Sequence, residues 1–180
     1  DYAAKLKPIT IEKQRLETPI AELTSREQTS LRALLGVLQW PASQGVPHLQ
    51  CSVSVLSGQV SRGTVQALIE ANKTLRFCKA NSDIGLHFMK IGDKKSDCTF
   101  IVLTDASWGT REDGASQGGY LVLLTHKSVL NGEVWPYIVI DWRSFKLTRV
   151  CRSSLSAEAQ ASAAGIDMLE CVKIFWGFGA

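Results

Sequence analysis

Three short segments rich in β-branched and other apolar residues follow one another in the second half of the chain, and they constrain its fold more than any other feature. They cover residues 99–105 (TFIVLTD), 118–124 (GGYLVLL) and 137–142 (YIVIDW). Each has the length and composition of a β-strand, and the links between them are short. Consecutive strands joined in this way usually pair as neighbours. The sequence therefore predicts a three-stranded antiparallel meander.

A long helix is expected after the third strand. Ser153 or Ser154 is a suitable N-cap, and apolar or small residues then recur on one helical face as far as about Trp176. The face that we expect to be buried comprises Leu155, Ala159, Ser162, Ile166, Leu169 and Val172. Three strands followed by one helix indicate a mixed α/β fold in which this helix packs across the sheet.

The first half of the chain has helical rather than strand periodicity. A capping-box pattern begins at Thr24 and precedes leucines spaced i, i+3, i+4 and i+7, which predicts an amphipathic helix that ends at Pro41. A second helix is expected to begin near Pro47, and a third to span about residues 64–79. Residues 24–80 are therefore predicted to form a small helical unit.

The segments that flank these helices are predicted to be connections. Residues 1–23 contain two prolines and several basic residues without a clear apolar period, which is typical of a linker or an extended arm. Residues 81–97 carry glycines and charged side chains around a short strand-like piece at 86–88. We expect this second segment to connect the helical unit to a domain that spans residues 98–180.

Composition excludes several classes of protein. Hydrophobic residues make up 45% of the 180 residues, which is enough for a hydrophobic core. No apolar run approaches the roughly 18 residues of a membrane-spanning helix, so we expect no membrane association. The net charge is only +3, so nucleic-acid binding would require local clustering of cations. The five cysteines include no C-x-x-C pair, which favours an intracellular setting, cytoplasmic or nuclear.

Two acidic residues are candidates for chemistry. Asp105 ends the first predicted strand, where an aspartate either turns the chain by accepting backbone N–H bonds or binds a metal ion. Glu158 falls in the first or second turn of the long helix, where an acid also complements the helix dipole. If these turns lie over the end of the first strand, the two carboxylates converge. A converging pair normally implies a shared proton or a hard cation such as Mg²⁺.

Four cationic residues recur at every third position just before the long helix. They are Arg143, Lys146, Arg149 and Arg152. One interpretation is that they contact the phosphate backbone of a nucleic acid. The other is a solvated loop that its charge keeps soluble. The sequence by itself does not decide between the two.

The order of these motifs resembles a known family. The segments LTDASWG, QGGYLVLL and IDWRSFKLTRVCRSSLSAEAQA are similar to the ribonuclease H domain of copia-type retrotransposon polyproteins. In that family an S-D-A-D-W-like strand, an S-G-Y strand and a W-R-S-x-K…L-S-S-T-E-A-E segment recur in the same order. The helical stretch upstream resembles the region that joins the reverse transcriptase to this domain. The resemblance covers roughly residues 25–176.

This resemblance implies a partial ribonuclease H-like domain, with Asp105 as its first-strand carboxylate and Glu158 as its helix carboxylate. Together with further acids they would bind two Mg²⁺ or Mn²⁺ ions and hydrolyse the RNA strand of an RNA–DNA hybrid, the expected partner. The acid that the family carries on a strand after the helix is absent from these 180 residues, and Ser107 stands where an acid is common. The resemblance thus implies a reverse transcriptase/ribonuclease H fragment that is incomplete and inactive as this chain.

The alternative is a non-enzymatic, element-derived structural or interaction module. In both cases the predicted sheet has an open edge, and the end of the long helix carries Ile174, Phe175 and Trp176. Exposed strand edges and apolar patches commonly bind other chains. We therefore expect a protein partner to cover the sheet edge and the end of the helix.

Overall fold

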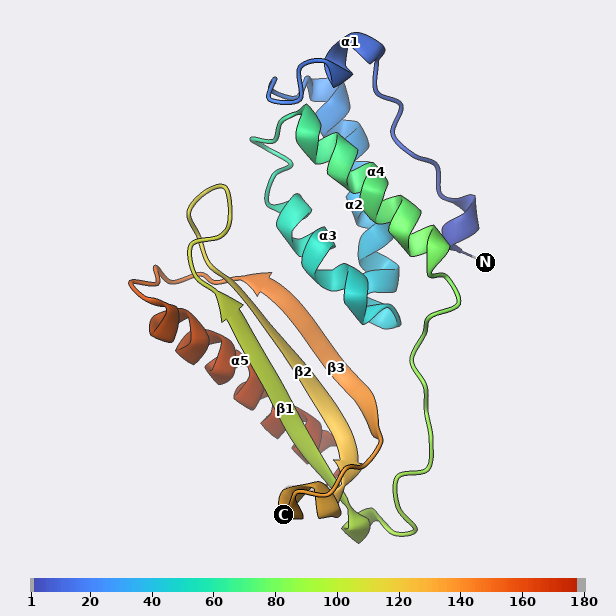
Figure 1. The fold of residues 1–180 in the computed structure, drawn as a ribbon, viewed down its shortest axis with the longest axis vertical. Coiled ribbons are helices and arrows are strands. Elements are labelled where there is room, and N and C mark those ends of the chain that lie inside the picture. Colours follow the sequence, from blue (N-terminus) through green and yellow to red (C-terminus); the bar gives the residue numbers. More distant parts are fainter. Residues whose placement is uncertain (1, 178–180) are drawn as a thin grey trace. The chain divides into compact units, whose positions relative to one another are not determined.

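The protein has a mixed α/β fold made of two compact units, Asp1–Gly85 and Leu86–Ala180 (Figure 1). The structure is a computed structural model that describes residues 2–177. The first unit contains helices, and the second contains a three-stranded sheet with one long helix. Each unit has its own hydrophobic core. Within residues 2–177, no helix is long and apolar enough to cross a bilayer.

Three helices build the core of the first unit. They are α2 (Ser25–Gln44), α3 (Gln50–Ser57) and α4 (Val65–Ala80), and a 3₁₀ turn, η2 (Pro47–Leu49), precedes α3. The leucines predicted to face inward are buried, and the capping box predicted at Thr24 is present. The apolar period of 3.6 residues therefore gave the correct buried faces here.

The prediction that the first of these helices ends at Pro41 is wrong, because α2 continues through this proline to Gln44. Proline has no N–H for the carbonyl four residues earlier, which here belongs to Val37. The hydroxyl of Tyr2 donates to the Val37 carbonyl at 3.1 Å and takes the place of the missing N–H. The helix then ends where the N–H groups of Gly45 and Val46 both bond to the Pro41 carbonyl.

Residues 1–23 were expected to be a linker or an arm, but they pack against the helices. This segment contains η1 (Ala3–Lys5) and α1 (Lys13–Leu16), and Ala3 and Leu23 are buried. The Asn72 side chain of α4 holds the extended part, since its Oδ1 accepts from the Ile9 N–H and its Nδ2 donates to the Ile9 carbonyl, both at 2.8 Å. Apolar side chains of the segment, among them Leu6, Ile9 and Ile11, also pack against the core, but their spacing follows neither a helical nor a strand period.

The second unit contains the predicted antiparallel meander. Its strands are β1 (Cys98–Ser107), β2 (Gln117–His126) and β3 (Tyr137–Lys146), in the order β1-β2-β3. A 3₁₀ turn, η3 (Lys95–Asp97), precedes β1, and another, η4 (Lys127–Asn131), follows β2. Residues 86–88 form no strand, so the strand-like pattern there was misleading. Its three residues lie among charged and glycine residues.

The long helix, α5 (Ser154–Phe175), runs along one face of this sheet (Figure 1). Ser153 caps it, because its hydroxyl accepts from the Ser156 N–H at 3.2 Å. The face predicted to be buried is wrong in part: Leu155 is 77% exposed and Ile166 is 51% exposed. The buried residues of α5 are small ones, namely Ala157, Ala161 and Gly165.

The small residues are buried because the helix approaches the sheet closely. A Cβ atom built on Gly165 would lie 2.6 Å from the Thr104 Cγ2 and 3.0 Å from the Val102 Cγ2. A larger side chain at this position would therefore push the helix off the sheet. Partly buried Met168, Leu169 and Val172 complete the contact further along α5.

Candidate functional site

One end of the sheet gathers the residues that the sequence singled out. The register places Ser107 of β1 opposite Gln117 of β2, and Gln117 opposite Lys146 of β3. The loop after β1 is tied to the loop before α5, because the Trp108 indole N–H donates to the Cys151 carbonyl at 2.9 Å. The end of β1, the start of α5 and the basic loop therefore lie together.

Glu158 lies on α5 at this end of β1. The hydroxyl groups of Thr104 and Ser162 are 3.0 Å apart, and Gly165, further along the helix, lies against Val102, further back along β1. The helix thus runs opposite to β1, and its first turns lie at the strand's C-terminal end. Glu158 is one turn before Ser162 and is half-buried. Glu158 therefore lies at the end of the strand where we expected the first turns of the helix.

Asp105 is exposed and projects from the other face of the sheet. Side chains alternate between faces along a strand, and Val102 and Thr104 face α5. Asp105 therefore points away from α5, opposite Gly119 of β2. The structure brings the two carboxylates to the same end of the sheet, but it places them on opposite faces.

The pair as it stands does not fit a two-metal centre. Within residues 2–177, β1 pairs only with β2, so a cation shared by the two carboxylates would have to lie around the free edge of β1. Mg²⁺ demands near-octahedral geometry from oxygen ligands that converge on one point. Two carboxylates on opposite faces of the sheet do not converge in this way.

A hydrogen-bonded network lies beside Asp105 on the same face, and the sequence did not reveal it. The Arg111 guanidinium donates to the side-chain oxygen Oε1 of Gln117, and the side-chain nitrogen Nε2 of Gln117 donates to the Ser144 hydroxyl at 2.8 Å. Asp105, Gly119 and Ser144 follow one another across the three strands. Because Gly119 has no side chain, it leaves an open surface between Asp105 and Ser144.

The sequence contained a signal for the open surface beside Asp105, but none for the bonds of Arg111. In a meander, the glycines of QGGYLVLL pair with the end of the preceding strand. One of them, Gly119, therefore lies beside Asp105. A Cβ atom at Gly119 would meet only the Arg143 carbonyl oxygen, at 3.4 Å. The buried side chain of Arg111, 6% exposed, is in a loop and had no periodicity to predict it.

The four predicted cations divide into two pairs. Arg143 lies 5.3 Å above the Phe145 ring on the α5 face, and Lys146 is bonded to the Asp113 carboxylate. This bond, together with the N–H of Ala115, lowers the pKa of Asp113. Arg149 and Arg152 are exposed in the loop between β3 and α5. The cations therefore do not form one row. All four are exposed, and Arg149 and Arg152 are the pair without an ion pair or ring contact among the described residues.

Asp141 lies on the α5 face of the sheet, away from Asp105. It is opposite Val122 and near Tyr120, and its buried Oδ2 has no hydrogen-bond partner among the described residues. Burial raises the pKa of Asp141, and burial beside this carboxylate raises the pKa of Tyr120. Arg143 and Cys171 are the other ionisable groups nearby. Asp141 is therefore part of the packing beneath α5, and it does not join Asp105.

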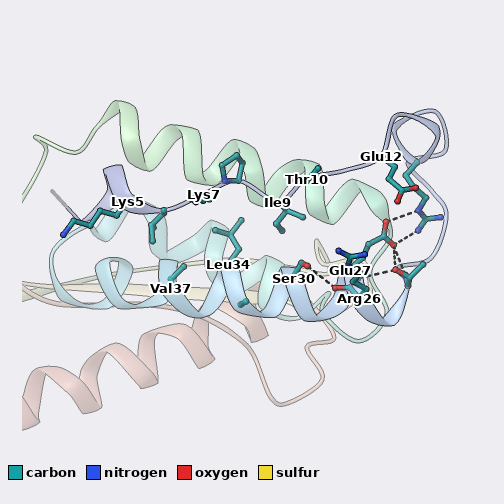
Figure 2. Close-up of a pocket in the computed structure, with 15 residues that line it drawn as sticks. Lys5, Lys7, Ile9, Thr10, Glu12, Arg26, Glu27, Ser30, Leu34 and Val37 are labelled. Carbon is teal, nitrogen blue, oxygen red and sulfur yellow. Dashed lines mark hydrogen bonds and ion pairs between the residues drawn. The ribbon is translucent and has the colours of Figure 1, made fainter.

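The first unit contains a separate groove between the arm and α2 (Figure 2). Its volume is about 700 Å³. Lys5 and Lys7 come from the arm, and Leu34 and Val37 from α2 (Figure 2). An ion pair closes one end, with 2.8 Å between the Arg15 Nη2 and a carboxylate oxygen of Glu27. The groove results from the packing of the arm, which the sequence did not predict.

Comparisons of the chain with protein-family models, with curated proteins and with solved structures found no match. The functional interpretation therefore rests on the residues and on their arrangement.

Proposed function

We propose that residues 98–176 are a ribonuclease H-like region related to copia-type retrotransposon polyproteins, and that the chain binds RNA–DNA hybrids without cleaving them. The observation that carries the proposal is the bond between the Trp108 indole and the Cys151 carbonyl. It joins the acidic end of β1 to the loop that carries Arg149 and Arg152. An acidic site and a phosphate-binding loop need this proximity to act on one nucleic acid.

The resemblance in motif order supports the nuclease origin of this surface. Asp105 lies near the end of β1, Glu158 lies in the second turn of the helix that crosses the sheet, and both are at the same end of the sheet. These are the positions that the resemblance assigns to the first two carboxylates of a ribonuclease H, for which Mg²⁺ or Mn²⁺ is the cofactor. The proposal thus places hybrid binding and any metal at this end of the sheet.

The absence of cleavage follows from the placement of the two carboxylates. Asp105 projects from the face opposite α5, and β1 has a free edge within the described residues. Hydrolysis of a phosphodiester by two metal ions requires ligands that hold both ions a fixed distance apart. Two carboxylates on opposite faces do not supply this. We therefore expect the chain to bind the hybrid through Arg149 and Arg152 without cleaving it.

A second candidate function is a non-enzymatic structural or interaction module. Exposed apolar side chains on the second unit favour it. Leu103, on the same face as Asp105, is 52% exposed, and Phe175 near the end of α5 is 87% exposed. Together with the free edge of β1, such residues commonly bind another protein chain. In this case the acids and the basic loop would have no role in nucleic-acid binding.

A cleavage assay tests the proposal and separates the two candidates. A labelled RNA–DNA hybrid is incubated with the chain in Mg²⁺ or Mn²⁺, and both retention of the hybrid and its length are measured. We expect a retained, intact hybrid. If the chain cuts the hybrid and Asp105→Asn does not, the two carboxylates suffice for catalysis. This result would contradict our account of the site. A hybrid that is neither cut nor retained would leave the interaction module as the function.

A further inference from the structure

A second pocket of the first unit lies at the C-terminal ends of α2 and α4. Its volume is about 540 Å³, and the residues that shape it include Tyr2, Trp40, Pro41, Val46, Cys78 and Asp83. Figure 1 shows that the N-terminal turn η1 lies beside the C-terminal end of α4. Pockets of this size, mainly apolar with a few polar groups, are typical sites for small molecules.

Two aromatic rings form one wall of this pocket. The ring centroids of Tyr2 and Trp40 are 5.2 Å apart at an interplanar angle of 49°, and the residues are 43% and 59% exposed. Tyr2 is fixed in place because Pro41 leaves the Val37 carbonyl free to accept from its hydroxyl. The wall is therefore preformed, and the negative faces of its rings attract cations.

The electrostatics of the pocket also favour a positive ligand. The ends of both α2 and α4 contribute residues to the lining, and the C-terminal end of a helix carries a partial negative charge. Asp83 adds a carboxylate, and the described residues that line the pocket include no lysine or arginine. The basic residue in the last turn of α4, Lys79, has its ammonium group 3.5 Å from the Ala4 carbonyl.

We propose that this pocket binds a small organic ammonium ion with an apolar body. Tyr2 and Trp40 would contact the cationic group, and Asp83 would balance its charge. Pro41, Val46 and the buried Cys78 would contact the apolar body. A neutral apolar molecule would gain only the last of these contacts, and an anion would be repelled. This inference is independent of the function proposed for the second unit.

Titration of the full chain with (2-phenylethyl)trimethylammonium, followed by NMR at the indole N–H of Trp40, tests the inference. We expect saturable shifts of this signal and several-fold weaker binding of 2-phenylethanol, which keeps the ring and lacks the charge. Trp40→Leu keeps an apolar wall but removes the larger ring. It should weaken binding about threefold, as expected for a cation–π contact at a partly exposed site. For this variant, binding is measured by calorimetry.

Two further variants test whether the carboxylate of Asp83 favours binding of the ammonium ion. Asp83→Asn removes the carboxylate from the pocket and should weaken binding of the ammonium ion but not that of 2-phenylethanol. Glu17→Gln, an equal change of charge at an exposed position of the same unit, should bind as the unsubstituted chain does. Equal affinity for the alcohol and the ammonium ion would overturn the proposal. So would the absence of saturable shifts at millimolar ammonium, or equal effects of the Asp83 and Glu17 substitutions.

Discussion

At the scale of single residues, Glu27 has the clearest energetic role in the structure. Its carboxylate accepts from the backbone N–H of Thr24 at 2.8 Å, and the same oxygen accepts from Arg15. The hydrogen bond from Arg15 is the largest cause that lowers the pKa of Glu27 to about 2, from an ordinary value of 4.5. The ionised carboxylate therefore joins the start of α2 to the arm.

Because the pKa of Glu27 is lower in the folded chain, its contribution to stability is present above pH 4.5 and is lost as the pH falls toward 2. Glu27→Gln keeps an acceptor for Thr24 but removes the charge. We expect the variant to be less stable than the unsubstituted chain at neutral pH and to lose less stability over this acidic range. Urea unfolding at several pH values measures both effects. Glu17→Gln is the control, and an unchanged pH dependence in Glu27→Gln would contradict this role.

At the scale of elements, the sequence predicted the positions of the strands and helices better than it predicted the faces they bury. Runs of β-branched and other apolar residues located β1 to β3, and the leucine period located the face of α2. The apolar pattern predicts the wrong face for part of α5, because large apolar residues dominate that pattern. Close packing on the sheet instead selects Ala157, Ala161 and Gly165, and small residues give only a weak hydrophobic signal.

The same packing makes a prediction about two glycines within helices. Gly165→Ala places a Cβ 2.6 Å from the Thr104 Cγ2, so it should destabilise the second unit by about 1–3 kcal/mol, the usual effect of overpacking. Gly36 lies within α2, and no atom lies within 4 Å of a Cβ built there. Gly36→Ala should therefore stabilise the first unit by about 0.5–1 kcal/mol through helix propensity. Urea unfolding followed by circular dichroism measures both, and effects of the same sign would contradict the packing described for α5.

At the scale of the whole molecule, the meander and the long helix followed from the sequence, but the site depended on geometry that it does not encode locally. Strand alternation applied to Asp105 alone does not indicate a face, because the face is fixed by which side α5 covers. The sequence likewise did not indicate that the basic residues divide into two pairs, because this depends on the ion pair between Lys146 and Asp113. The arm of the first unit was missed because Asn72, a polar residue, anchors it from 63 positions away.

The measurement that tests the central claim most directly is the salt dependence of hybrid binding, followed by fluorescence anisotropy of a labelled RNA–DNA duplex. Arg149→Gln and Arg152→Gln are each compared with Lys127→Gln, an exposed residue at the opposite end of the sheet. We predict weaker binding for each arginine variant, with a slope of log affinity against log salt that is shallower, that is, less negative by about 0.9. The Lys127 variant should keep the original slope. Equal slopes for all three variants and the unsubstituted chain would contradict the claim that this end of the sheet binds nucleic acid.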